Sequence, residues 1–542
     1  MSKNDNFRKN VMVQGSILAA ASIIVRLIGL VYRIPLTRVL GDTAMGYYGY
    51  AYEIYNLALI LSSYSLPLAV SKLVSARLVK KQYKNSHKVF TFTMAFSAIM
   101  GAVMSLLLVA FAEVYAKIIK CPGVIIPLRI LAPTIFVFSV MGVIRGYFQG
   151  YGNMVPTAIS QVIEQIVNAV VSIVAAYLLM KANTGKNQLS WGAGGGTLGT
   201  FSGALAAFIS LILMYAYAGP LMKKKQLKDR TEVLESNKFI FKVLMLTAIP
   251  VIVSQTIYQI SGTLDSVIYN AIEGKTVDEV TRSTMWGIYS NKYRLLTNVP
   301  VAVASAMGTA IVPSLIAEFV IGRYDALKAK IATVVKFNMI IAFPSAVGMS
   351  VLAHPILLLL FKDNRHDSTV MLRIGGVCII FFALSTVTNG VLQGINKMRL
   401  PVIHSAISLL IHIPLLIILL KFANLGAYAL VICNVIFPLV VCILNWRSIG
   451  KLIDYKQEVV RTFLIPCAAS LIMGAITFGV YKLFAIFAGN AISTLFALAA
   501  AVFSYFFFLI KLGGVTKEEM LGMPKGSSFV RLLSKIGLFK NA

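Results

Sequence analysis

The stretch "RGYFQGYGNMVPTAISQVIEQ" (Arg145–Gln165) carries the clearest signal of the fold. Glycines and a proline separate two apolar segments, and the second segment then places amide and carboxylate side chains in a hydrophobic run. Proline is tolerated in the first turn of a helix, where its missing N–H is not needed. The pattern therefore predicts a helix, a tight turn formed by Gly146, Gln149 and Gly150, and a second helix that begins at Pro156.

The turn motif occurs a second time in the chain. The glycine, glutamine and glycine of the first turn recur 244 residues later, as Gly390, Gln393 and Gly394. The proline recurs as Pro401, one position later than this offset predicts. Six apolar segments separate the copies, and because six is even, both copies have the same orientation across a membrane. The repeat predicts a parallel duplication of a six-helix unit, an architecture of transporters in which the substrate site lies between the repeats.

The composition is that of a membrane protein. The chain has 542 residues, of which 58% are hydrophobic and 13% are charged, whereas soluble domains are roughly 45–50% apolar and about 25% charged. A membrane-spanning helix needs about 20 mainly apolar residues. Segments that meet this requirement lie near residues 11–38, 45–71, 89–114, 124–147, 156–181, 193–218, 239–268, 284–314, 331–361, 370–393, 400–420, 425–446, 459–484 and 490–511.

We therefore predict an all-α polytopic membrane protein with about 14 transmembrane helices, arranged as two parallel-repeat six-helix lobes plus two C-terminal helices. The polar segment 223–238 is expected to be a cytoplasmic linker. It separates an N-terminal lobe, residues 1–222, from a C-terminal lobe, residues 239–446. The last two helices and a cytoplasmic amphipathic tail occupy residues 447–542.

The distribution of charge predicts the orientation. The chain has 50 Lys+Arg against 20 Asp+Glu, a formal net charge of +30. Most of the basic residues fall in alternate connecting segments, and such an excess marks the cytoplasmic side of a membrane protein. We predict a multi-pass membrane protein with both termini in the cytoplasm, and no nucleic-acid partner. The tail "SSFVRLLSKIGLFK" spaces its apolar residues along one helical face, which suits either a helix on the inner leaflet or a solubilising tail.

Several functional classes lack their sequence motifs. The five cysteines form no CxxC pair, and the chain contains neither a P-loop nor a GxSxG motif. We therefore expect a transporter rather than an enzyme, without a cofactor or metal ion, driven by the membrane potential or an ion gradient. A membrane glycosyltransferase or polymerase is the alternative, and it would use loop carboxylates such as those of "EGKTVDEV" (Glu273–Val280).

The segment after the first turn has a polar face. Gln161, Glu164, Gln165 and Asn168 are spaced at i, i+3, i+4 and i+7, which places them on one side of a helix. Polar side chains are costly in contact with lipid, so this face is expected to line a cavity or to contact another helix. Lining a hydrophilic cavity and hydrogen bonding between helices are both consistent with the spacing.

Basic residues also lie inside apolar segments. Arg26 and Arg33 are seven residues apart, about two helical turns, and Lys292 and Arg294 precede Pro300 in another segment. An arginine within the membrane indicates function by default, and its planar fork of donors matches phosphate. These residues predict a cationic cavity for an anionic substrate. The alternative is that they form ion pairs, or take part in ion coupling, with Glu53, Asp265 or Glu164.

Four segments resemble the MurJ and stage V sporulation protein B branch of the MOP flippase superfamily, also described as polysaccharide biosynthesis proteins. They are the Arg145–Gln165 stretch, "SLPLAVSKLV" (Ser65–Val74), "RLIGLVYR" (Arg26–Arg33) and "VPVAVASAMGTAIVPSL" (Val299–Leu315). The resemblance implies fourteen helices, alternating access, and translocation of an undecaprenyl-diphosphate-linked saccharide. It names lipid II, the peptidoglycan precursor, as the expected cargo, with membrane lipids and cell-wall synthesis proteins as partners.

The resemblance also extends to single residues. The cavity arginines of the family's first helix are similar to Arg26 and Arg33. The arginine of its eighth helix lies five residues before a proline, whereas Arg294 lies six residues before Pro300. One residue rotates a helix by about 100°, which leaves open whether Arg294 or Lys292 faces the cavity. Another polyprenyl-linked polysaccharide precursor as cargo, and a multidrug/cation antiporter with an acidic cavity, are the alternatives within the superfamily.

Overall fold

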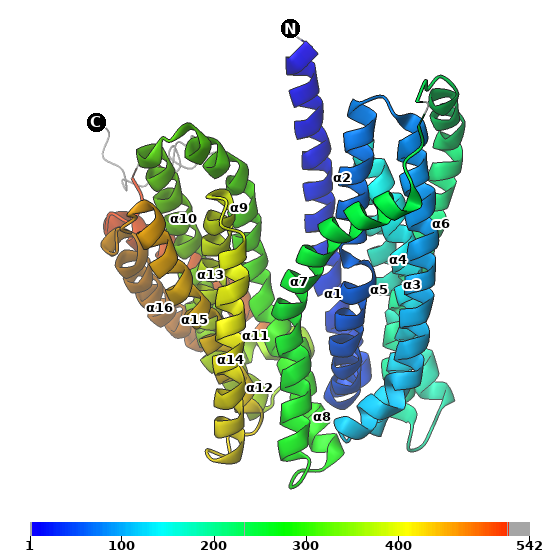
Figure 1. Ribbon diagram of the computed structural model, residues 1–542. Coiled ribbons are helices and arrows are strands. Elements are labelled where there is room, and N and C mark those ends of the chain that lie inside the picture. Colours follow the sequence, from blue (N-terminus) through cyan, green and yellow to red (C-terminus); the bar gives the residue numbers. More distant parts are fainter. Residues whose placement is uncertain (1–2, 232, 517–518, 520–542) are drawn as a thin grey trace. The chain divides into compact units, whose positions relative to one another are not determined.

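The computed structural model describes residues 3–231, 233–516 and 519, and these residues form helices joined by short connections, without a strand (Figure 1). The helices are α1 (Lys3–Leu59), α2 (Leu66–Val79), α3 (Tyr83–Ile118), α4 (Ile125–Gly150), α5 (Val155–Ala182), α6 (Gln188–Leu227), α7 (Asn237–Glu273), α8 (Glu279–Ile288), α9 (Arg294–Ile321), α10 (Tyr324–Val351), α11 (Ala353–Phe361), α12 (His366–Gly375), α13 (Cys378–Gly394), α14 (Arg399–Lys421), α15 (Ala427–Ile453), α16 (Ile465–Phe487) and α17 (Asn490–Lys511). The predicted amphipathic tail lies outside the described residues.

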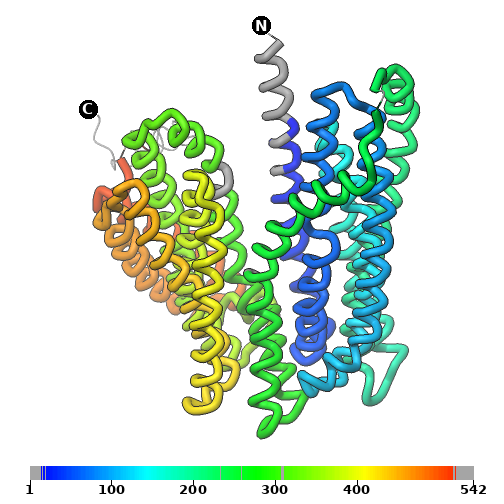
Figure 2. Tube along the Cα trace, viewed as in Figure 1, coloured from blue at the N-terminus to red at the C-terminus, as the bar shows by residue number. Residues whose placement is uncertain are grey.

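The number of membrane-spanning helices agrees with the sequence prediction. Thirteen helical segments of the described residues are long and apolar enough to cross a bilayer, and the first of them, Ser16–Val79, has 64 residues. This segment is drawn in blue in Figure 2. It is interrupted at Gly41, whose φ of 71° is a left-handed conformation that glycine adopts readily. Since one crossing needs about 20 residues, Ser16–Val79 holds two crossings, and the prediction of fourteen is confirmed.

The chain divides into two compact units, residues 1–291 and 292–542. The division falls in the π-helical turn Tyr289–Tyr293 and not in the predicted linker 223–238. Helix α7, which we assigned to the C-terminal lobe, packs on the first unit: the Thr263 hydroxyl donates to the Glu53 carbonyl oxygen at 3.2 Å. The compact units thus differ from the predicted lobes, 1–222 and 239–446.

The predicted linker is itself structured. Its first residues belong to α6, which continues to Leu227, and the residues after α6 return to the turn between α2 and α3. The backbone N–H of Lys84 donates to the Asp229 carboxylate at 2.7 Å. The segment between α6 and α7 is therefore held against the first unit.

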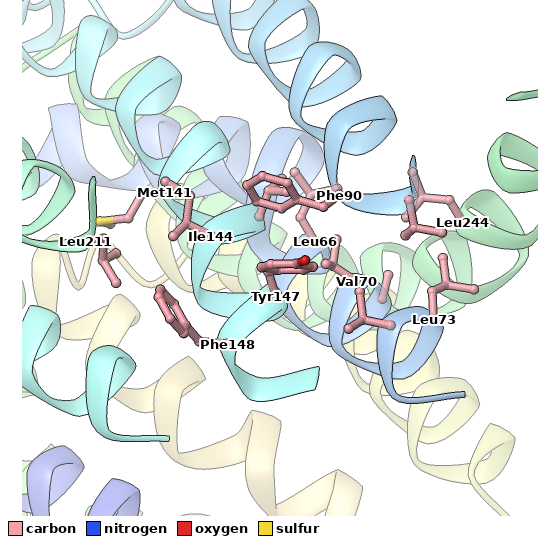
Figure 3. Close-up of a cluster of buried hydrophobic side chains, with 14 of the residues drawn as sticks. Leu66, Val70, Leu73, Phe90, Met141, Ile144, Tyr147, Phe148, Leu211 and Leu244 are labelled. Atoms are coloured by element: carbon pink, nitrogen blue, oxygen red, sulfur yellow. The ribbon is translucent and has the colours of Figure 1, made fainter. Parts of the chain in front are cut away.

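The core of the first unit joins five helices (Figure 3). Tyr147 of α4 lies at its centre, and the ring centroids of Tyr147 and Phe90 are 4.4 Å apart. In a membrane, helices associate through close van der Waals packing, because lipid tails are as apolar as the side chains. The buried residues labelled in Figure 3 are Leu66, Val70, Leu73, Phe90, Met141, Ile144, Tyr147, Phe148, Leu211 and Leu244.

Close packing of α5 on α6 depends on a row of glycines four residues apart, Gly195, Gly199 and Gly203. A Cβ atom on Gly195 would lie 2.5 Å from the carbonyl oxygen of Ala175, and one on Gly199 would lie 2.0 Å from Ser172 Oγ. A Cβ atom on Gly203 would lie 2.5 Å from the carbonyl oxygen of Glu164. Because glycine has no Cβ, the two backbones can approach directly, as is typical of membrane helix pairs.

A similar contact corrects our interpretation of the first motif. Gly146 and Gly150 lie inside α4, not in the turn, and they pack against α2. A Cβ atom on Gly146 would lie 2.6 Å from the Pro67 carbonyl oxygen, and one on Gly150 would lie 2.6 Å from Val74 Cγ1. The turn itself follows at residues 151–154, and Pro156 stands in the first turn of α5 as predicted.

Both copies of the motif close their turn in the same way. After α4, the N–H of Gly152 donates to the Gln149 carbonyl at 2.9 Å, and the N–H of Asn153 donates to Phe148 at 3.1 Å. After α13, the corresponding bonds run from Asn396 to Gln393 at 3.0 Å and from Lys397 to Leu392 at 2.8 Å. This pair of bonds is a common helix C-terminal cap. The 244-residue offset therefore also relates two turns that are closed by the same pair of hydrogen bonds.

The residues around the two turns match as well. Gly152 and Asn396 both have a positive φ, 76° and 60°. Gly394 packs on a neighbouring helix as Gly150 does, since a Cβ atom there would lie 2.8 Å from Leu315 Cβ of α9. Gly390 is buried in α13, and Pro401 lies in the first turn of α14.

Candidate functional site

Arg33 of α1 lies among tyrosines. Its guanidinium lies close to the hydroxyl groups of Tyr32, Tyr48 and Tyr52. The Tyr32 and Tyr48 oxygens are 3.5 Å apart, and Tyr52 hydrogen-bonds with Thr200 of α6. Tyrosines from both crossings of α1 therefore surround this arginine, and α6 holds one of them through Thr200.

Among the described residues, no carboxylate forms an ion pair with Arg33. A guanidinium carries five N–H donors and a full positive charge, and tyrosine hydroxyls satisfy donors without neutralising the charge. The alternative that we left open, a structural pair between Arg33 and Glu53, is absent from this part of the chain. Arg33 is therefore equipped to bind an anion.

Arg26 and Gln165 lie along the same face of α1. Gly29 stands between the two arginines, three residues after Arg26 and four before Arg33, which is the spacing of a single helix face. A Cβ atom on Gly29 would lie 3.7 Å from Gln165 Oε1, so the amide of α5 contacts α1 at this point. Arg26 is exposed and Arg33 is half-buried. We call Arg26, Arg33 and Gln165 the α1/α5 face.

Glu164 has a different role from Gln165. Its Oε2 atom lies 2.9 Å from Nη2 of Arg145, and the two side chains are only 14% and 10% exposed. The Nε atom of Arg145 also donates to Ser160 Oγ at 3.0 Å. The first charged residue of the Arg145–Gln165 motif is thus paired with the last one, and the pair ties α4 to α5 across the turn.

The other polar residues of α5 were expected either to line a cavity or to form hydrogen bonds between helices. Asn168 is buried and accepts a hydrogen bond from the Ser172 hydroxyl at 2.9 Å, beside the close contact with α6. It therefore serves helix packing. Gln161 is half-buried, and its Oε1 atom is buried without a hydrogen-bond partner among the described residues. Its predicted place in a cavity lining stays a prediction.

Replacing Glu164 by alanine is expected to lower the amount of folded protein in the membrane. The change leaves Arg145 charged and buried, and breaking a buried pair costs about 3–5 kcal/mol. The double variant Glu164→Ala/Arg145→Ala should recover much of the loss, because no unpaired charge remains. Fluorescence-detected size exclusion of the solubilised protein measures both. A normal amount of folded Glu164→Ala protein that fails in transport would instead assign Glu164 to the substrate.

The basic residues of the second unit are in a different environment. Lys292 is buried, and its Nζ atom lies 2.6 Å from Asp363 Oδ2, with the two side chains 4% and 5% exposed. Ser368 Oγ donates to the same carboxylate at 2.5 Å. This pair accounts for the charge of Lys292 without a substrate. Arg294 is half-buried at the start of α9, close to the Cys378 thiol, and its predicted cavity role stays a prediction.

The two predicted acidic partners lie against α7 or within it. A Cβ atom on Gly262 would lie 2.3 Å from Glu53 Oε2, so this carboxylate packs directly on α7. Asp265 of α7 is buried, with 4% of its surface exposed. Among the described residues, no group of three or more His, Cys, Asp or Glu side chains could hold a metal ion.

Sequence reasoning overlooked the tyrosines around Arg33 and the glycine row of α6. The tyrosines could have been noticed, since Tyr48, Tyr52 and Tyr55 are spaced like one face of a helix. The stretch "GGGTLGTFSG" likewise shows the four-residue glycine spacing of a membrane helix contact. The partner of each feature lies far away in the chain and needed the fold to identify it.

Comparison with known proteins gives the family. The polysaccharide biosynthesis protein family model matches residues 11–318, and the MatE model matches residues 294–418. Lipid II flippase MurJ of Bacillus subtilis (strain 168) is 27% identical over 422 residues, which cover 75% of this chain and 76% of the relative. Stage V sporulation protein B of the same organism is 23% identical over 524 residues, 95% of this chain and 98% of the relative.

A solved structure gives the same fold. The structure described as lipid II flippase MurJ in an inward closed conformation has a TM-score of 0.66 at 15% identity, and the match covers 91% of this chain and 97% of that one. At this identity the likeness concerns the fold alone. The family match to residues 11–318 extends over more than half of the 542 residues. The chain is therefore a multi-pass membrane protein of the polysaccharide biosynthesis protein family.

Proposed function

We propose that this protein is a flippase that moves an undecaprenyl-diphosphate-linked saccharide from the inner to the outer leaflet, with lipid II as its cargo. The observation that carries the proposal is Arg33, a guanidinium held by tyrosine hydroxyls with no carboxylate partner among the described residues. Arg26 and Gln165 extend the same polar surface along α1. The relative named lipid II flippase MurJ supports the choice of cargo.

The chemistry of the cargo explains why arginine is needed. A diphosphate cannot cross hydrocarbon unpaired, because burying an uncompensated charge costs many kcal/mol. Arginine offers a planar fork of donors that matches phosphate oxygens, and these bonds are stronger than those between neutral groups. The α1/α5 face would replace the hydration of the diphosphate, while the polyprenyl chain stays in lipid. The protein then only has to carry the polar head across.

The energy source and the orientation belong to the same proposal. The sequence has no nucleotide-binding motif, so we infer that the membrane potential or an ion gradient drives transport, at about 2.3 kcal/mol per charge per 100 mV. The alternating basic segments support cytoplasmic termini. Reporter-enzyme fusions to each terminus test this orientation, which periplasmic or external activity at either end would contradict.

A second cargo is supported by a separate observation. The relative named stage V sporulation protein B matches 95% of this chain, a larger share than the 75% matched by the relative named lipid II flippase MurJ. A different polyprenyl-linked polysaccharide precursor is therefore the alternative cargo. The MatE match to residues 294–418 suggests a multidrug/cation antiporter as a further alternative function. A cation would be repelled by Arg33, which argues against that function.

Depleting the protein is expected to make one undecaprenyl-diphosphate-linked saccharide accumulate in the inner leaflet, since its exit is blocked. Mass spectrometry of extracted lipids identifies the saccharide, and a membrane-impermeant probe of its sugar reports the leaflet. Restoring expression should reverse the accumulation. Accumulation of lipid II supports the proposed cargo, and accumulation of another lipid-linked saccharide supports the second one. Unchanged levels and sidedness of every such lipid would contradict both.

A further inference from the structure

A polar pocket of about 600 Å³ lies between the α2–α3 turn and the connection from α6 to α7. Lys80 and Lys81 line it from the turn, and Lys228, Asp229 and Arg230 line it from the connection. Its volume is within the range of small-molecule sites, roughly 300–1,000 Å³. The proposed transport of a lipid-linked saccharide gives this pocket no role.

The walls of the pocket are held in place by buried polar contacts. Arg77 of α2 pairs with Glu235 of the connection, Nη2 to Oε2, at 2.5 Å, and the two side chains are 7% and 21% exposed. The amide of Asn85 donates to the Val233 carbonyl at 3.3 Å and accepts from the N–H of Glu235 at 3.0 Å. The connection is therefore fixed to α2 and α3 at several points, and the pocket is formed before any ligand binds.

The pocket has a surplus of positive charge. The side chains of Lys80, Lys81, Lys228 and Arg230 are exposed, and within the described part of the chain none of them forms an ion pair. Among the described residues of the lining, four cations therefore face one carboxylate, that of Asp229. Lysine and arginine are the residues that bind phosphate groups in proteins.

Asp229, the carboxylate among the described lining residues, accepts hydrogen bonds from within the protein. Asp229 accepts hydrogen bonds from the N–H of Lys84 at 2.7 Å, the N–H of Thr231 at 2.8 Å and the Thr231 hydroxyl at 2.5 Å. Desolvation opposes ionisation, but these hydrogen bonds outweigh it and hold the pKa of Asp229 below its usual value. No ion pair joins Asp229 to a lining cation among the described residues, and its one negative charge offsets only a quarter of the four positive charges.

The pocket lies where membrane spans end. The candidate spans end at Val79 and Leu227 and begin at Tyr83 and Asn237 on the two connections that form its walls. Figure 1 shows the connection from α6 to α7 passing the α2–α3 turn at this end of the first unit. Lipid phosphate groups lie at the depth where spans end. Basic clusters beside the membrane attract anionic headgroups.

We propose that this pocket is a binding site for a phosphate-bearing anion, separate from the α1/α5 face that binds the cargo. The phosphate is presented either by an anionic phospholipid of the adjacent leaflet or by a soluble phosphate compound. Bound phosphate would bridge the α2–α3 turn and the α6–α7 connection through the cations of both. It would thereby stabilise the first unit where its helices α2, α3, α6 and α7 meet the aqueous phase.

The experiment uses the purified full-length protein in a neutral detergent. Phosphatidylglycerol, phosphatidylcholine and inorganic pyrophosphate are titrated separately, and the midpoint of thermal unfolding is followed by tryptophan fluorescence. A ligand that binds only the folded state raises this midpoint as its concentration rises. We expect phosphatidylglycerol, pyrophosphate or both to raise it, and phosphatidylcholine to have no effect. A response to phosphatidylglycerol alone identifies a lipid headgroup, and a response to pyrophosphate alone identifies a soluble phosphate.

Two triple variants separate the pocket from general attraction to anions. Lys80→Gln/Lys228→Gln/Arg230→Gln removes three lining cations, and Lys223→Gln/Lys224→Gln/Lys225→Gln removes three exposed lysines of α6 that do not line the pocket. One basic residue near an anionic surface accounts for about five-fold in affinity, so the pocket variant should bind roughly 100-fold more weakly. The α6 variant should bind like the wild type.

Equal weakening in the two triple variants would overturn the proposal, since it would show a diffuse effect of net charge. The same holds if no phosphate probe raises the midpoint of the wild-type protein. Should the pocket variant give too little folded protein, Lys228→Gln is compared with Lys224→Gln, with an expected difference of about five-fold. None of these residues belongs to the α1/α5 face, so loss of pocket binding leaves cargo accumulation on depletion as an independent test of the proposed transport.

Discussion

Replacing Arg33 by alanine is expected to abolish transport of the lipid-linked saccharide while the protein reaches the membrane in wild-type amounts. The guanidinium has tyrosine partners but no carboxylate partner among the described residues, so its removal leaves no unpaired buried charge behind. Losing one partner of a buried charged contact costs about 2–5 kcal/mol of binding, or roughly 30- to 4,000-fold. Complementation of a depleted strain measures function, and membrane immunoblotting measures the amount of protein.

Arg33→Lys tests the chemistry of this contact. Lysine restores the positive charge but not the planar fork, so recovery should be partial. A role in pairing with Glu53 would give a different result. In that case Arg33→Ala would reduce the amount of folded protein, and the double variant Arg33→Ala/Glu53→Ala would restore it. The structure, with the Glu53 carboxylate packed on Gly262 of α7, leads us to expect no such restoration.

Arg129→Ala is the matched control for Arg33→Ala. Its guanidinium pairs with Glu113 at 2.7 Å, and these side chains are 46% and 57% exposed. Such an exposed pair contributes only about 0–1 kcal/mol, so this variant should complement fully. Full complementation by Arg33→Ala as well would refute the role of Arg33 in binding the cargo and would move the site to Arg26 and Arg294.

Adding one methyl group at Gly195 is expected to separate α5 from α6 and to lower the stability of the first unit. The new Cβ would lie 2.5 Å from backbone atoms of Ala175 and Ala176, which cannot rotate away as a side chain can. Overpacking usually costs about 1–3 kcal/mol, and we expect the upper part of this range because two backbones must move apart. The unfolding midpoint and the monodisperse fraction of purified Gly195→Ala report the effect.

Gly219→Ala is the matched control, because it lies on the same helix with no neighbouring atom within 4 Å of the added Cβ. Alanine is a better helix former than glycine by about 1 kcal/mol, so this variant should be as stable as the wild type or slightly more so. Equal midpoints for the two variants would show that the glycine row is not what sets the distance between α5 and α6.

The number of helices could be predicted from the sequence because each crossing is a local feature. An apolar run of the right length is enough, and the break at Gly41 falls in the gap between the predicted segments 11–38 and 45–71. Glu164 shows where local reasoning stopped. Its spacing placed it correctly on a polar face, but its partner Arg145 is 19 residues away across the turn. Only the geometry of that turn brings the two together.

The site was predictable in part for the same reason. Arg33 was identified because an arginine inside an apolar run is visible without a structure, whereas Tyr48 and Tyr52 reach it only through the fold. Lys292 was selected by the same rule, and the fold gave it a buried partner 71 residues further along, Asp363. A charged residue inside a membrane helix is therefore a candidate either for substrate binding or for a structural ion pair. The neighbours that the fold brings to it decide between these two roles.

The two helix ends at Gly152 and Asn396 show what the repeat in this chain preserves. Glycine stands at one end and asparagine at the other, and asparagine is, after glycine, among the residues that enter a left-handed conformation most easily. What the two copies share at this point is the sign of a backbone angle, and their side chains differ only within the few types that can adopt it.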